Sequence, residues 1–113
     1  MDKMLKQLEE YGADTKGTMD RFLNDMELYR TCFTAYLEDE VFLKLGEALH
    51  RKDYENAFEY AHTLKGTTGN MGLTPLYQVI CRMVEALRKK EYSNLQNDYT
   101  IVMEQLKQLE KYK

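Results

Sequence analysis

Apolar residues recur at helical spacing along almost the whole chain, and this pattern constrains the fold more than any other feature. The sequence contains a single proline, Pro75, so almost nothing interrupts long helices. Near its end the chain keeps one face apolar for about four turns, through Leu95, Tyr99, Val102, Leu106 and Leu109. The sequence therefore predicts an all-α protein.

Residues that favour helix ends divide this pattern into segments. Gly72 is expected to end one helix in a left-handed conformation, and Thr74 and Pro75 are expected to cap and open the next. Aspartate favours N-caps because its carboxylate accepts hydrogen bonds from the free backbone amides of the first turn. The other expected boundary residues are Gly12 as a C-terminal stop and, as N-caps, Asp14 or Thr15, Asp25 and Asp53.

The last four substantial helices, expected over about 41–52, 53–71, 74–90 and 95–109, are joined by short connections. Short connections favour antiparallel neighbours, so we expect an antiparallel up-down four-helix bundle. Short N-terminal helices are expected to cap one end of this bundle. The length fits one domain over residues 1–113, and such a chain can bury a core without a metal or a disulfide.

The charge pattern argues against nucleic-acid and membrane partners. The formal net charge is −3 and no basic stripe dominates, which disfavours binding to nucleic acid. The basic run 88–90 is typical of a helix C-terminus. No apolar run is long enough to span a membrane, and the interleaved charges of residues 1–6 do not form a secretory signal. We therefore expect a cytoplasmic protein.

The chain offers few residues for a metal site or a disulfide framework. Its two cysteines, Cys32 and Cys81, and its two histidines, His50 and His62, do not have metal-ligand spacing. We expect no bound metal and reduced thiols. His50, which ends a helix among cationic residues, is expected to be a surface or capping residue.

His62 stands out because glycines follow it at four and seven residues within a strongly helical stretch. Each glycine inside a helix costs about 1 kcal/mol relative to alanine, so stability alone does not explain them. At roughly 100° per residue, His62 lies about 140° from the middle of the core-facing stripe and is expected to face solvent. Lys65 lies beside it, and Gly66 and Gly69 leave space for something large to approach.

This arrangement suits an exposed nucleophile that receives an anionic group. A neutral imidazole is a good nucleophile near pH 7, and Lys65, one turn away, can approach a phosphoryl group on the ring. Glu55 and Glu59 share the face, either orienting the ring or serving as ordinary surface carboxylates. The sequence has neither a dedicated acid–base partner nor a nucleotide-binding glycine loop, so we expect a group carrier rather than a self-sufficient enzyme.

The motif His62-x-Leu64-Lys65-Gly66, with Gly72 ten residues after the histidine, resembles the signature of histidine-containing phosphotransfer (HPt) domains. The resemblance covers essentially the whole chain. It includes the spacing of Leu76, Cys81 and Glu85 in the next helix and the upstream residues Phe22, Asn24, Asp25, Leu28 and Tyr29.

The resemblance implies a phosphorelay carrier. His62 would accept a phosphoryl group from the phospho-aspartate of a receiver domain and pass it to the aspartate of another receiver. Lys65 would stabilise the phosphoryl oxygens and Gly66 would allow approach, while the docking role of Gly69 is inferred from geometry. The chain would need no cofactor of its own, because the receiver supplies magnesium. Phe58 would either join the apolar patch that meets a receiver helix or pack inward.

The expected partners are the receiver domains of response regulators and a hybrid sensor histidine kinase, with the chain acting as a monomer. An alternative is a non-phosphorylated helical scaffold or inhibitor that binds a signalling partner. Such a protein would be expected to have lost His62 or Lys65, and both are present. A third hypothesis is the phosphoryl-carrying module of a chemotaxis-type kinase, which would be accompanied by kinase domains that these 113 residues do not contain.

Overall fold

The computed structural model describes residues 2–113, and this range contains seven helices and no strand. The all-helical prediction is confirmed. No helix of residues 2–113 combines the length and the apolarity needed to cross a lipid bilayer. The helices are α1 (Lys3–Tyr11), α2 (Thr15–Arg21), α3 (Met26–Leu37), α4 (Val41–His50), α5 (Tyr54–Asn70), α6 (Thr74–Arg88) and α7 (Leu95–Glu110).

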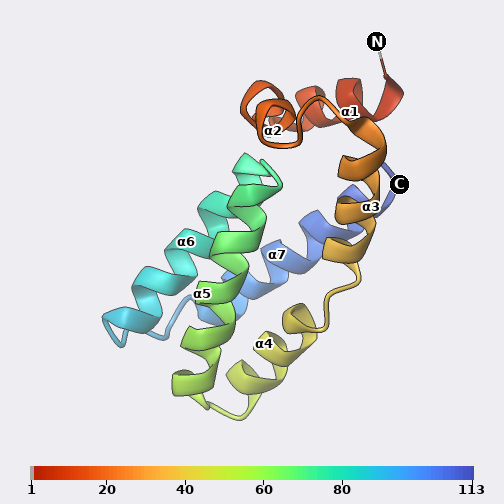
Figure 1. Ribbon diagram of the computed structural model, residues 1–113. Coiled ribbons are helices and arrows are strands. Elements are labelled where there is room, and N and C mark those ends of the chain that lie inside the picture. The colour runs from red at the N-terminus through yellow and green to blue at the C-terminus, as the bar shows by residue number, and fades with distance from the viewer. Residues whose placement is uncertain (1) are drawn as a thin grey trace.

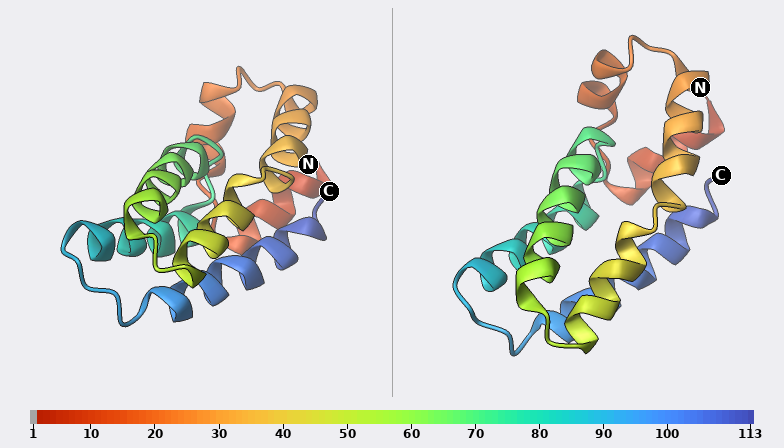
Figure 2. Two further views of the ribbon diagram at one scale, coloured as in Figure 1. Left: turned by 90° about the horizontal axis from the view of Figure 1, so that it is seen from below. Right: turned by 60° about the horizontal axis from the view of Figure 1, so that its bottom comes forward.

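The helices α4 to α7 pack around a common core. Helix α5 lies between α4 and α6, and α7 packs against α6 and also contacts α3 and α4. From α4 to α7, each helix runs opposite to the one before it, and α1 and α2 cover one end (Figure 1). Helix α4 follows α3 after a short break and runs on in nearly the same direction. Together the two helices form one long side of the molecule (Figure 2). Each of the four core helices contributes a fully buried residue, Leu45, Leu64, Ile80 and Val102.

Three aspartates begin helices as the sequence predicted. The Oδ1 atoms of Asp14, Asp25 and Asp53 accept hydrogen bonds from backbone amides in the first turns of α2, α3 and α5, at 3.1, 3.0 and 3.3 Å. Because each carboxylate satisfies an amide that has no partner within the helix, these caps determine where each helix begins.

The start of α6 differs from the prediction. Thr74 is a helical residue of the first turn, and the N-cap is Leu73, which makes no side-chain cap. The cap comes instead from another helix, because the hydroxyl of Tyr11 accepts a hydrogen bond from the amide of Leu76 at 3.1 Å. The same hydroxyl donates to Oε1 of Gln105, so one side chain of α1 links α6 and α7.

The C-terminal end of α5 is held by side chains from two other helices. The hydroxyl of Tyr29 on α3 donates to the carbonyl of Met71 at 2.9 Å, and burial raises the pKa of Tyr29, which keeps this donor protonated. Arg21 on α2 donates to the carbonyl of Asn70 at 3.2 Å. Gly72 then turns the chain with φ of +73°, so the predicted left-handed stop is confirmed.

We expect Gly72→Ala to destabilise the protein by about 2 kcal/mol or more, because a Cβ here is strained at positive φ and overlaps Oγ1 of Thr18. Chemical denaturation followed by circular dichroism measures the change. Asn70→Ala, an exposed change two residues earlier, is the control and is expected to stay within about 0.5 kcal/mol of the wild type. If Gly72→Ala were as stable as the control, the positive φ and the close contact with Thr18 at this turn would be contradicted.

Candidate functional site

His62 lies in the middle of α5 with its side chain exposed to solvent. The opposite face of the helix is buried, through Ala57, Ala61, Leu64 and Thr68, none of which has measurable exposure. This burial sets the rotation of α5 about its axis. The outward orientation predicted for His62 is therefore the one observed.

The imidazole has an aromatic neighbour one turn earlier. The rings of Phe58 and His62 are stacked, with centroids 5.8 Å apart and planes 16° from parallel. The sequence left two environments open for Phe58, and the structure places it half-buried against the core with its ring beside His62.

A cation from α6 completes this stack. The guanidinium carbon of Arg88 lies 5.8 Å from the centroid of the Phe58 ring, and its Nη1 donates to Oε1 of Glu85 at 2.5 Å. In the sequence, Arg88 is typical of the basic end of a helix and nothing more. No local signal connects it to Phe58, because the two residues are far apart in the chain and meet only when α5 packs against α6.

Lys65 lies one turn after His62 and is half-buried. In the part of the chain that the structure describes, no carboxylate forms an ion pair with its ammonium group. An anion bound at His62 would therefore not have to displace an internal partner of this cation. A lysine in this position supplies a point charge that suits phosphoryl oxygens.

The two glycines that follow His62 have different surroundings. A Cβ added at Gly66 would meet no atom within 4 Å, so this position opens directly onto solvent. A Cβ added at Gly69 would lie 3.0 Å from Cε1 of Tyr77 on α6. Gly69 thus allows α5 and α6 to approach closely. The sequence could not indicate this packing role, because Tyr77 belongs to another helix.

A shallow groove runs beside His62 between α3 and α5. Gly66 and Thr63 line its α5 side, and Cys32 and Ala35 line its α3 side. Its walls are small and mostly apolar, which is suitable for contact with another protein. The sequence does not indicate that α3 borders the site, because the face of α3 that approaches α5 is determined by tertiary packing.

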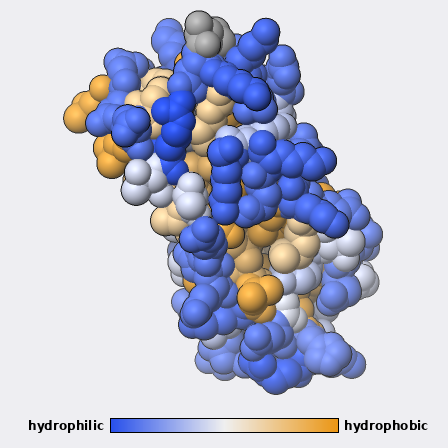
Figure 3. Space-filling model, turned by 90° about the vertical axis from the view of Figure 1, so that its right-hand side faces the viewer, coloured by the Kyte–Doolittle hydropathy of each residue, from blue (hydrophilic) through white to orange (hydrophobic). Residues whose placement is uncertain are grey.

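The face formed by α3, α4 and α7 is mainly polar. Figure 3 shows charged and polar side chains over most of it, with apolar surface in small separate areas. The exposed large apolar residues of the described chain are Leu23, Leu28 and Leu43. Scattered exposed apolar residues are ordinary on a protein surface.

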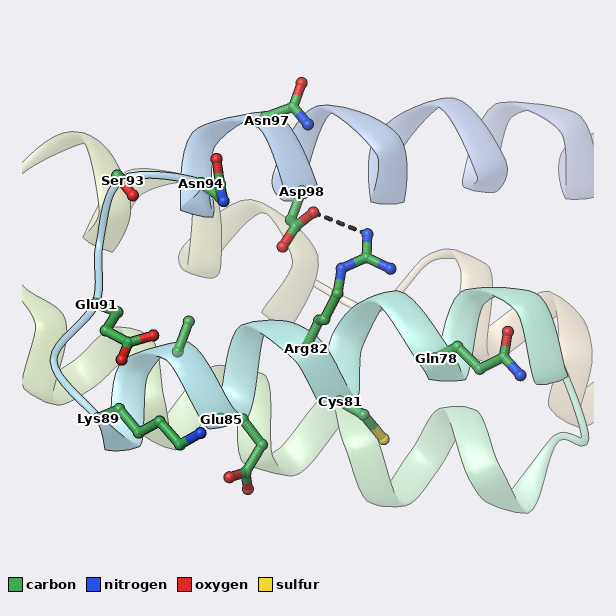
Figure 4. A pocket seen from close by; sticks show the side chains of 11 residues that line it. Gln78, Cys81, Arg82, Glu85, Lys89, Glu91, Ser93, Asn94, Asn97 and Asp98 are labelled. Carbon is green, nitrogen blue, oxygen red and sulfur yellow. Dashed lines mark hydrogen bonds and ion pairs between the residues drawn. The ribbon is translucent and has the colours of Figure 1, made fainter.

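A second groove, between α6 and α7, is separate from the candidate site. Arg82 donates to the buried carboxylate of Asp98 at 2.9 Å across this groove (Figure 4). This pairing raises the pKa of Arg82 above its ordinary value. Neither His62 nor Lys65 lines the groove. The ion pair links the two helices.

The chain as a whole is similar to a known protein family. A family model described as "Hpt domain" matches residues 3–111, which is nearly the whole chain. No curated protein and no solved structure matches the chain. Within residues 2–113, no group of three or more histidine, cysteine or acidic side chains is placed to hold a metal ion.

Alanine substitutions at Gly66 and Gly69 test the different surroundings of the two positions. We expect Gly66→Ala to stabilise the protein by about 0.5–1 kcal/mol, because alanine favours a helix and the added methyl group meets open space. Gly69→Ala should lose most or all of that gain, because the ring of Tyr77 must shift. Denaturation midpoints measure both variants. Equal gains in stability would show that Gly69 is not a packing position.

Proposed function

We propose, from the premise that this chain belongs to the Hpt domain family, that His62 is the residue on which it carries a phosphoryl group. Hpt domains are phosphocarrier modules, so the chain has a phosphotransfer role in two-component signalling. The observation that supports His62 as the carrier is its exposed imidazole on a helix whose opposite face is completely buried. His50, the other histidine, ends α4 and is also exposed, but no lysine follows it at a comparable spacing.

The proposed reaction moves one phosphoryl group between two proteins. A ring nitrogen of neutral His62 attacks the phosphorus of a receiver's phospho-aspartate, and the bond between phosphorus and the aspartate oxygen breaks. The aspartate leaves as a carboxylate, and the ring loses its other proton to solvent. The ring then regains a proton from solvent, the carboxylate of a second receiver attacks the phosphohistidine, the bond between phosphorus and the ring nitrogen breaks, and neutral imidazole leaves. Positioning and neutralisation of charge provide most of the catalysis in such transfers.

Lys65 is proposed to neutralise charge on the phosphoryl oxygens. Its half-buried stem lies on the same helix as His62, and its ammonium group has no ion-pair partner within residues 2–113. The phosphoryl group is anionic before and after transfer, so a nearby cation favours its approach and its residence on the ring. Magnesium, bound by the receiver, would supply the remaining positive charge.

The receiver is proposed to dock on the outer face of α5. Gly66 leaves the backbone exposed next to His62, and the groove between α3 and α5 begins there. Phe58 extends the apolar surface on the other side of the histidine. Gly69 lies on the side of α5 that packs against Tyr77, so it borders this face and shapes it only through that contact. A hybrid sensor kinase and separate response regulators could present such receivers in turn.

The phosphorylated residue is tested by labelling. When the protein is mixed with a phosphorylated receiver domain and magnesium, we expect label that is labile in acid and stable in alkali. His62→Gln should abolish the label, because no other side chain in the site offers an imidazole. His50→Gln is the matched control and should be labelled like the wild type. Label that persists on His62→Gln would refute the assignment, and no label on the wild type from any receiver of the same organism would favour a scaffold.

Lys65→Ala is expected to slow transfer roughly 10- to 100-fold, as removal of a charge-assisted contact costs about 1.5–3 kcal/mol. Rapid-quench kinetics with a phosphorylated receiver measures the rate. Circular dichroism should show unchanged helicity, since Lys65 is not part of the buried face of α5. Lys65→Arg keeps the cation and should retain more activity. Lost helicity in Lys65→Ala would instead show that the lysine is structural.

A further inference from the structure

The ring of Phe58 stacks on the imidazole of His62 and is placed to orient it. The Phe58 ring lies 5.8 Å away and 16° from parallel, which is an offset stacking geometry. The hydrogen bonds and ion pairs of residues 2–113 include none to the imidazole. An exposed histidine without such a neighbour would move among several rotamers.

Stacking orients an imidazole without using its nitrogens. A hydrogen-bonding partner would occupy one of the two nitrogens, whereas Phe58 contacts the π face of the ring. The nucleophilic lone pair lies in the plane of the ring, so it stays free. An aromatic neighbour is therefore compatible with a histidine that must be both oriented and reactive.

Phe58 is in turn held by α6. Its side chain is half-buried and packs against the core, and it lines a surface groove together with buried Leu87. The guanidinium of Arg88 lies 5.8 Å from the Phe58 centroid, within the range of a cation–π contact. The same guanidinium forms an ion pair with Glu85 on α6. Contacts on α6 thus reach His62 through Phe58.

We infer that Phe58 is a positioning residue that holds the imidazole of His62 in the orientation needed for phosphoryl transfer, and that Arg88 supports it. This inference rests on the proposed function of His62. Restricting the ring to one orientation keeps its nucleophilic nitrogen directed towards an incoming phosphorus, which raises the fraction of encounters that can react. A pure docking contact would act differently, because it would change the affinity for a receiver and not the reactivity of the ring.

The experiment separates reactivity from docking by using a small phosphodonor. With phosphoramidate, a nitrogen of His62 attacks phosphorus, the P–N bond breaks and ammonia leaves, so no receiver is needed. Phe58→Leu keeps an apolar side chain but removes the aromatic face, and Phe58→Tyr restores that face. Tyr54→Leu is the matched control, because Tyr54 is a half-buried aromatic residue on the same helix that stacks on Tyr92, at 3.6 Å and 12°.

We expect Phe58→Leu to slow phosphorylation by phosphoramidate about 3- to 10-fold, and to lower kcat with a phosphorylated receiver by a similar factor while KM changes less. Phe58→Tyr should recover most of the rate, and Arg88→Gln should produce a smaller loss. In NMR spectra, the carbon-bound ring protons of His62 should lose their ring-current shift in Phe58→Leu and keep it in Tyr54→Leu.

Three results would overturn the inference. A change confined to KM would make Phe58 a docking contact. Equal rate losses in Phe58→Leu and Tyr54→Leu would make the effect a general loss of packing. An unchanged His62 spectrum in Phe58→Leu would show that the rings do not stack. If the ring shift and the phosphoramidate rate depend on Phe58 but no receiver transfers to the wild type, the positioning role is supported and the relay function is refuted.

Discussion

The burial of one face of α5 between α4 and α6 determines where every other side chain of that helix points. The residues that pack inward are mostly small, and Ala57 and Ala61 bring the neighbouring helices close. A rotation of α5 that moved His62 inward would expose this face and bury the charged one, which has a prohibitive cost. The position of the imidazole is therefore a consequence of packing in the core rather than of contacts at the site itself.

Both ends of α5 are anchored as well, so the helix can neither slide nor fray easily. Asp53 caps its start, and hydrogen bonds from α2 and α3 hold its last carbonyls. Within the core, the buried hydroxyls of Tyr36 and Thr68 are hydrogen-bonded, which joins α3 to α5. This anchoring holds the exposed face of α5, including His62, in one position relative to the core.

The site contains little besides an accessible imidazole, a nearby cation and room for a partner. This small set of groups fits a phosphocarrier module of the Hpt domain family. Gly66 provides space on the outside of α5, whereas Gly69 provides space on the inside, against Tyr77. The two glycines look equivalent in the sequence. In the folded protein, Gly66 lies at the solvent-exposed surface and Gly69 at the contact between α5 and α6.

The sequence by itself determined the all-helical fold, the stop at Gly72 and the outward direction of His62, because each depends on residues within a few positions of one another. Helical periodicity and positive-φ preferences are local properties. Only the tertiary structure decided that Arg88 lies over the ring of Phe58 and that Tyr11, rather than Thr74, caps α6. These contacts join residues on different helices, and helical periodicity shows which face of a helix is buried but not which residue of another helix meets it.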